Sequence, residues 1–157
     1  MKYECKILIG TTFCGKSTYA AKHQYTHKII ETDIVKYDSQ RGNLSITDYV
    51  NQLISNEKDV ILDQTKCGKA ELIDLIEKIK EHHNVKLVIF DVSYKQILAN
   101  RAYSDRNVRK SPKTENYIQE RFNEWTRQKD AILNLDYDKE IIHDYINDGI
   151  DDFLSKL

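Results

Sequence analysis

The chain contains few of the residues that interrupt regular structure. Its 157 residues include one proline and five glycines, and it shows no linker, internal repeat or low-complexity tract. Because independent domains commonly have about 100–150 residues, we expect residues 1–157 to fold as a single domain around one core.

Long apolar runs are also missing. No stretch of the sequence approaches the roughly 18 apolar residues that a membrane helix requires, and the first four residues lead directly into a short strand-like run. We therefore expect no membrane partner and a soluble, cytoplasmic location.

Cysteine is scarce, with only Cys5, Cys14 and Cys67 scattered along the chain. Three such residues exclude a disulfide framework or a zinc site and predict free thiols. Cys14 precedes a predicted helix, where a thiol can become acidic and redox-sensitive. The simpler interpretation, a small side chain that its loop tolerates, is favoured.

A dominant charge of either sign is absent, since 24 basic and 25 acidic residues give a net charge of −1. This balance neither requires nor excludes a nucleic-acid partner, which needs only a local basic patch. The acidic residues Asp144, Asp148, Asp151 and Asp152 gather near the C-terminus. One segment is basic, through Arg101, Arg106, Arg109, Lys110 and Lys113.

The chain does contain five apolar runs separated mostly by segments with helical periodicity. The runs cover residues 6–9, 28–31, 59–63, 85–92 and 140–143. This alternation predicts an α/β fold in which helices cover both faces of a five-stranded parallel sheet.

The clearest helical stripe runs from Ile46 to Ile54, and Ser45 with Asp48 predicts a capping box at its start. Further helices are expected over 72–79, after Ser93, over 118–133 and over 150–157. Ser111-Pro112 is the expected start of the long helix 118–133. Within these stripes, Trp125 and Phe153 are expected in the core rather than stacked on a nucleotide.

The most specific pattern is a G-x-x-x-x-G-K-S motif that directly follows the first apolar run. Glycines let the backbone approach phosphates, a lysine reaches the β and γ oxygens, and a hydroxyl ligates magnesium. The motif therefore predicts an ATP and Mg²⁺ site, with Lys16 catalytic and Ser17 on the metal. The expected nucleotide-binding residues are Gly10, Thr11, Thr12, Phe13, Cys14, Gly15, Lys16, Ser17 and Thr18.

Acidic residues follow three of the predicted strands, where ligands collect in an open parallel sheet. Asp63 occupies the Walker B position, and we expect it to orient magnesium or substrate, with Thr65 also at the substrate. The alternative is that Asp63 caps the next helix. For Asp91 the simpler interpretation is favoured, because Asp-Val-Ser leads into a helix that Ser93 can cap.

Asp33 follows the second predicted strand and is the expected general base for phosphoryl transfer to a hydroxyl. Lys36, three residues later, is positioned to hold a phosphate of the acceptor. The alternative role for Asp33 is to cap the helix that begins at Ile34, and both roles can coexist.

The basic segment 101–113 is expected to form a short lid that brings arginine to the transferred phosphoryl group. Arg106 and Arg109 are both candidates, and the sequence does not choose between them. The alternative is a solvated charged loop.

Together these motifs resemble the small P-loop kinases related to polynucleotide 5′-kinase, over most of the chain. In that family an acid after the second strand is the general base, which matches Asp33, and a nearby basic residue matches Lys36. The family's Asp-x-Thr-Asn motif resembles the run from Asp63 to Lys66, and its arginine-bearing lid resembles 101–112. The resemblance implies a kinase-type P-loop NTPase fold.

The chain departs from this family at three positions. Phe13 replaces a small residue, typically glycine, Lys36 replaces arginine, and Lys66 replaces asparagine. Lysine gives a point-charge contact where arginine gives a bidentate one.

The first functional hypothesis is therefore an ATP-dependent kinase acting on the 5′-hydroxyl of DNA or RNA. The second is a kinase of the same fold for a small molecule such as a nucleoside, nucleotide or sugar. A third is a nucleotide-binding switch with little transfer activity, motivated by Phe13. No guanine-reading Asn-Lys-x-Asp sequence is present, which argues against a GTPase.

Overall fold

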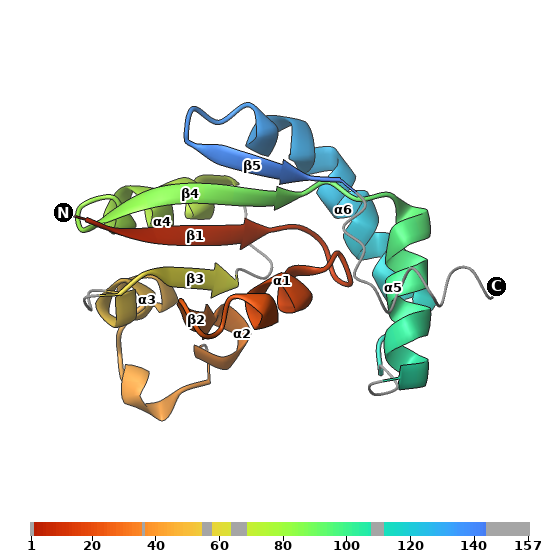
Figure 1. Cartoon of the computed structure of the whole chain (residues 1–157), viewed down its shortest axis with the longest axis horizontal. Helices are drawn as coiled ribbons and strands as arrows, with labels where there is room; N and C mark the ends of the chain where they lie inside the picture. The colour runs from red at the N-terminus through yellow and green to blue at the C-terminus, as the bar shows by residue number, and fades with distance from the viewer. Residues whose placement is uncertain (1, 36, 55–57, 64–68, 108–111, 144–157) are drawn as a thin grey trace.

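A five-stranded parallel sheet forms the centre of the fold (Figure 1). The computed structural model describes residues 2–35, 37–54, 58–63, 69–107 and 112–143, with the side chains of 33 and 34 left out. The strands are β1 (Tyr3–Ile9), β2 (Lys28–Glu31), β3 (Val60–Asp63), β4 (His83–Phe90) and β5 (Lys139–Ile142). Their order in the sheet is β2-β3-β1-β4-β5, and every neighbouring pair is parallel. The predicted α/β architecture is confirmed.

The strands β1, β3 and β4 are buried over most of their length, which explains why they read as continuous apolar runs. The strand β2 has the predicted bounds. The strand β4 begins and ends two residues earlier than predicted. It ends at Phe90 because the chain turns into a helix capped by Ser93, although the Asp91 N–H still bonds to the Ile142 carbonyl at 2.9 Å.

Helices cover both faces of the sheet, as the sequence predicted. They are α1 (Lys16–Lys22), α2 (Thr32–Val35), α3 (Ile46–Ile54), α4 (Lys69–Ile79), α5 (Tyr94–Asn107) and α6 (Glu115–Leu133), with a 3₁₀ turn η1 (Ser39–Arg41). Side chains of α3 and α4 pack on one face, and side chains of α1 and α5 pack on the other. The helix α6 contributes to both layers, through Ile118 on the α1 side and Trp125 on the α4 side. Trp125 is buried in the core, as predicted.

Hydroxyl side chains begin three of the helices. Ser45 Oγ accepts from the Asp48 N–H at 3.1 Å, and Ser93 Oγ accepts from the Gln96 N–H at 3.1 Å, so both predicted caps are confirmed. The expected start of the long helix at Ser111-Pro112 is wrong. Thr114 is its N-cap instead, because its hydroxyl accepts from the Tyr117 N–H at 3.1 Å.

All parallel strands end at the same edge of the sheet, which fixes where the candidate site lies. The arrowheads of β1, β4 and β5 point toward the side where α5 stands (Figure 1). The loop between β1 and α1 also lies at this edge. Within the described ranges, no helix combines the length and apolar character needed to cross a bilayer. The predicted helix 150–157, including Phe153, lies outside the described residues.

Candidate functional site

The loop 10–15 joins the buried end of β1 to the first turn of α1 and is held in a tight conformation. A Cβ on Gly10 would stand 2.6 Å from Cys14 Sγ and 3.0 Å from Phe90 Cβ, so only glycine fits there without movement. Gly15 has φ of 107° and caps α1 in the left-handed region that glycine adopts at little cost. Each motif glycine is therefore required for its own steric reason: close contact at Gly10 and positive φ at Gly15.

Lys16 is the first residue of α1, and it folds back across the loop. Its side chain is 8% exposed, and Nζ donates to the Gly10 carbonyl at 3.1 Å. The ammonium group thus contacts the first residue of the phosphate motif. Ser17 is exposed at the next position and Thr18 is half-buried.

Phe13 carries the strain in this loop. It has φ of 59°, a conformation that costs a non-glycine residue about 1–2 kcal/mol. Asn100 of α5 stabilises it, since Nδ2 donates to the Phe13 carbonyl at 2.7 Å. The left-handed backbone explains why glycine suits this position. The hydrogen bond from Asn100 helps this chain to accommodate phenylalanine there.

The Cys14 side chain is 1% exposed, in the layer between the sheet and α1. Burial raises the pKa of its thiol to about 11, with Lys16 opposing the change more weakly. A reactive thiolate needs a lowered pKa and access to solvent. The structure therefore supports the simpler interpretation, a small packed side chain. Cys5 is likewise a free buried thiol, whereas Cys67 lies outside the described residues.

Asp63 ends β3 at the same edge of the sheet and is buried. The backbone register places its Cα between Leu8 of β1 and Glu31 of β2. Thr32 Oγ1 donates to the Asp63 carbonyl at 3.2 Å, which ties the end of β3 to the start of α2. An acid is therefore held beside the phosphate loop, as the Walker B prediction requires.

The other predicted site residues near Asp63 are only partly described. The backbone of Asp33 lies in α2, directly after β2 and therefore at the carboxyl edge. Because α2 begins at Thr32, Asp33 lies inside the helical turn rather than before it, which corrects the capping alternative. Lys36 and Thr65 lie outside the described residues.

The first half of the predicted lid belongs to α5, which continues to Asn107. The segment 94–107 contains neither glycine nor proline to end the helix earlier. Arg106 is exposed in the last turn of this helix, and Arg109 lies outside the described residues. The loop alternative is thus wrong for residues 101–107.

Two residues of the basic segment, Arg101 and Lys113, connect α5 to the phosphate loop. Arg101 donates from a terminal guanidinium nitrogen to the Lys113 carbonyl at 2.9 Å. Lys113 Nζ in turn donates to Thr12 Oγ1 at 2.9 Å and lies 5.9 Å from the centre of the Phe13 ring. A cation from the predicted lid therefore already lies at the rim of the loop.

Asp91, the third acid at a strand end, has structural partners. Its carboxylate lies 3.0 Å from Lys129 Nζ of α6 and 3.6 Å from His143 Nδ1 after β5. Ser93 caps α5 as predicted. This supports the favoured, structural interpretation of Asp91.

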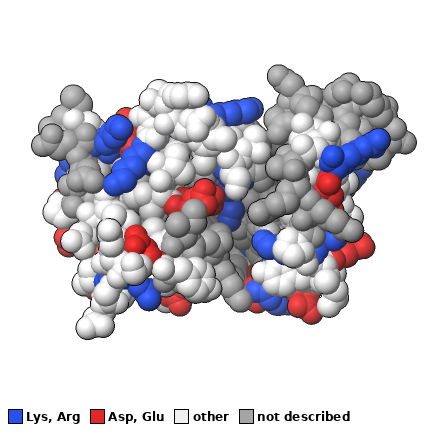
Figure 2. All heavy atoms as spheres, turned by 90° about the horizontal axis from the view of Figure 1, so that it is seen from below, with Lys and Arg blue, Asp and Glu red and all other residues white. Residues whose placement is uncertain are grey.

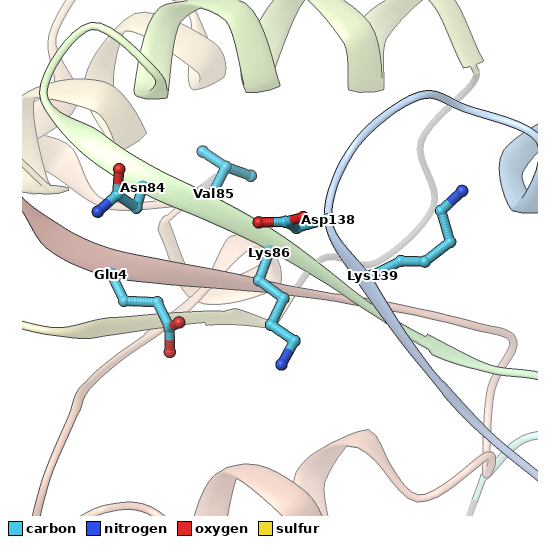
Figure 3. A pocket seen from close by; sticks show the side chains of 6 residues that line it. All are labelled: Glu4, Asn84, Val85, Lys86, Asp138 and Lys139. Atoms are coloured by element: carbon cyan, nitrogen blue, oxygen red, sulfur yellow. The ribbon is translucent and has the colours of Figure 1, made fainter.

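A separate cavity has a volume of about 360 Å³ (Figure 3). It is lined by Glu4, Asn84, Val85, Lys86, Asp138 and Lys139. These residues come from the amino-terminal halves of β1 and β4, from the start of β5 and from Asp138 just before it. Ligands of open parallel sheets bind outside the opposite, carboxyl ends, and this cavity contains none of the predicted site residues.

The charges on the face seen in Figure 2 are mixed. Basic and acidic side chains lie interspersed over the described part of this face, without one continuous basic stripe. A groove that tracks a long nucleic-acid strand is typically lined with positive charge.

The loop has several properties that fit a bound phosphate chain. Thr11 Oγ1 is buried with no hydrogen-bond partner among the residues described here, and buried hydroxyls usually have one. Together with the Lys16 ammonium and the exposed Ser17 hydroxyl, it offers groups that complement phosphate and magnesium.

Three residues near this edge were not assigned a site role from the sequence: Glu31, Asn100 and Lys113. Lys113 carried a weak signal, its membership of the basic segment. Glu31 is adjacent to Asp63 only through the pairing of β2 with β3. Asn100 reaches Phe13 across 87 positions, and no local pattern marks such a contact.

Known structures have a similar fold, although no family model and no curated protein matches the sequence. A chain of the Pnkp1/Rnl/Hen1 RNA repair complex aligns with a TM-score of 0.66 and 18% identity, covering 87% of this chain and 47% of its own. A fungal RNA kinase aligns with a TM-score of 0.58 and 15% identity, covering 99% and 85%. A sugar kinase from Janibacter sp. HTCC2649 aligns with a TM-score of 0.60 and 14% identity, covering 99% and 94%.

The present chain thus spans about half the length of the matched chain in the RNA repair complex and nearly all of the sugar kinase. At these identities the likeness concerns the fold. The motif, the sheet order and these neighbours agree, and the chain has the kinase-type P-loop fold.

Proposed function

We propose that this protein is an ATP-dependent kinase that phosphorylates the 5′-hydroxyl at an end of DNA or RNA. The observation that carries the proposal is the convergence of three groups at one sheet edge. These are the loop with Lys16 folded across it, the buried Asp63 at the end of β3, and the Lys113 ammonium at the rim. Phosphoryl transfer is catalysed mainly by positioning and by offsetting charge, which this edge provides.

In the proposed reaction, loop N–H groups and Lys16 bind the β- and γ-phosphates of ATP. Ser17 and Asp63 would hold Mg²⁺, which would supply positive charge to offset the negative charge that develops on the phosphates. Asp33 accepts the proton as the acceptor oxygen bonds to the γ-phosphorus. The bond from that phosphorus to the bridging oxygen breaks, and ADP leaves. Arg106 or Arg109 offsets charge on the transferred group.

Lys36 and Thr65 are the residues proposed to bind the acceptor, and Lys36 contacts a phosphate of the nucleic acid. A 5′ end presents one hydroxyl close to one phosphate, so a short contact is sufficient. The mixed charge on the face seen in Figure 2 agrees with binding of an end rather than of a long strand. Two of the similar structures are named for RNA repair and RNA kinase activity, which supports a nucleic-acid acceptor.

A small-molecule acceptor is the second candidate. The similar sugar kinase covers nearly all of this chain over nearly all of its own length. In this case the segment 37–43 and α3 would enclose a compact acceptor beside Asp33. The same phosphate loop and metal residues would serve either acceptor.

One experiment separates these functions. The protein is incubated with γ-labelled ATP and Mg²⁺ together with 5′-hydroxyl DNA and RNA oligonucleotides, nucleosides, nucleotides and sugars. Label on oligonucleotide 5′ ends is the expected result, and matched 5′-phosphorylated oligonucleotides are the control. Label on small molecules but never on oligonucleotides would refute the first candidate and support the second. Binding of ATP without labelling of any acceptor would favour a nucleotide-binding switch.

A further inference from the structure

Two buried amide side chains of α5 form a continuous hydrogen-bonded path to the phosphate loop. Gln96 Nε2 donates to Asn100 Oδ1 at 2.8 Å, and Asn100 Nδ2 donates to the Phe13 carbonyl at 2.7 Å. Gln96 is 5% exposed and Asn100 is 7% exposed. Burying an amide side chain costs free energy unless the amide is hydrogen-bonded. Loss of either bond would therefore leave a buried amide group without that partner.

The second bond fixes the direction of a peptide group inside the loop. A trans peptide is planar, and its carbonyl and N–H point in opposite directions. Because the Phe13 carbonyl points to Asn100, the N–H of Cys14 points away from α5. Binding of phosphate by such a loop depends on backbone N–H groups that already point toward the anion.

The bond also acts on the one non-glycine residue of the described chain with positive φ, which is Phe13. Glycine adopts this conformation readily, whereas phenylalanine adopts it against a steric cost. The free-energy cost of this conformation and the stabilisation by one buried hydrogen bond are both about 1 kcal/mol. Loss of the bond therefore leaves Phe13 free to return to a right-handed or extended conformation.

We propose that Gln96 and Asn100 are positioning residues that hold the Phe13 peptide in the nucleotide-binding conformation. This inference rests on the proposed nucleotide site. It assigns to α5 a role in the cradle itself, separate from any cation that α5 carries to the substrate. In this chain the amide pair replaces the conformational freedom that glycine would supply at position 13.

The test compares binding of a fluorescent ATP analogue by the full chain and by Asn100→Leu, which keeps side-chain volume and removes the donor. We expect Kd to rise about tenfold, the effect of one buried hydrogen bond. The matched control is Asn123→Leu in α6. Asn123 Oδ1 accepts from Gln119 Nε2 at 3.1 Å in the same i, i+4 arrangement, but on the exposed surface, so its Kd should stay within about twofold.

The decisive measurement repeats Asn100→Leu in a Phe13→Gly background. Glycine needs no support in the left-handed region, so the loss in affinity should shrink to about threefold or less. An equal loss in both backgrounds would show that Asn100 acts by general packing and would overturn the proposal. Thermal unfolding of each variant without nucleotide identifies any that fail to fold. If Asn100→Leu does not fold, Gln96→Leu serves as the second variant. It should lower the affinity for the ATP analogue by less than about tenfold when residue 13 is phenylalanine, and leave it unchanged when residue 13 is glycine.

The outcome is separable from that of the proposed function. Normal phosphoryl transfer with unchanged Kd in Asn100→Leu would leave the kinase standing and overturn the positioning role. Nucleotide binding that depends on Asn100, without transfer to any acceptor, would support the positioning role and overturn the kinase. Absence of nucleotide binding by the unchanged protein would overturn both.

Discussion

Lys113 Nζ donates to Thr12 Oγ1 at 2.9 Å, a contact between residues 101 positions apart. The bond of Arg101 to the Lys113 carbonyl holds the backbone on the other side of this contact. Lys113 is therefore held between α5 and the phosphate loop. Lys113 is also exposed, so its ammonium group can exchange the threonine hydroxyl for a phosphate oxygen.

The first prediction concerns this lysine. Lys113→Ala should lower kcat/KM for ATP by about tenfold, or ~1.4 kcal/mol, because a cation near the transferred phosphoryl group is lost. Steady-state kinetics at varied ATP concentration measure this effect. Lys113→Arg should retain most of the activity, since it keeps the charge.

The control for Lys113 is Lys95→Ala, which removes an exposed charge from the first turn of α5. It should leave kcat/KM within about twofold, since surface substitutions away from special features have small effects. Equal losses in Lys95→Ala and Lys113→Ala would show that only the overall charge of the protein matters.

The second prediction separates nucleotide binding from chemistry. Lys16→Ala should weaken ATP binding by roughly 10- to 150-fold, the value of about 1.5–3 kcal/mol for hydrogen bonds to a charged group. Asp33→Asn should keep ATP affinity and lose about 10²–10⁴ in kcat, because the general base is removed. Calorimetric titration with ATP and single-turnover transfer measure the two effects independently. Near-normal turnover in Asp33→Asn would show that another group accepts the proton.

The third prediction uses the packing between Gly10 and Cys14. Gly10→Ala brings a methyl group to 2.6 Å from Cys14 Sγ, and such overpacking typically costs about 1–3 kcal/mol. Cys14→Ala removes the sulfur and should restore part of the lost stability in the double variant. The remaining 3.0 Å contact with Phe90 Cβ prevents full recovery. Chemical denaturation of the two single variants and the double variant gives the coupling energy, and strict additivity would contradict a direct contact between positions 10 and 14.

The sheet and the phosphate loop could be predicted because their signals are local. Buried parallel strands read as apolar runs, and the motif marks Gly10 and Gly15, the two positions where the loop conformation requires glycine. The cap at Ser45 was predictable from a serine directly before a helical stripe. The cap of α6 was not, because Ser111-Pro112 also has the pattern of a helix start, whereas the Thr114 hydroxyl caps the helix.

The contacts that shape the site were not predictable in the same way. Asn100 and Phe13 meet only because β4 lies beside β1 and α5 continues from β4 along the edge of the sheet. A polar residue within a helical pattern normally indicates a solvated position, so the burial of Asn100 has no local signature. Glu31 likewise approaches Asp63 through strand pairing alone.

The last prediction concerns Cys14, whose place in the phosphate loop could suggest a redox-sensitive thiol. Its pKa is raised to about 11 by burial, so at pH 8 only about one molecule in a thousand carries the thiolate, the form that reacts with alkylating reagents. Iodoacetamide at pH 8 should therefore leave Cys14 unmodified in the folded protein and modify it rapidly in denaturant, as peptide mass spectrometry can measure. Cys5, whose pKa burial raises to about 12, serves as an internal reference and should be protected to a similar degree. Selective labelling of Cys14 under native conditions would mean that the loop opens far enough to expose the sulfur, and the close packing on Gly10 would then not describe its resting state.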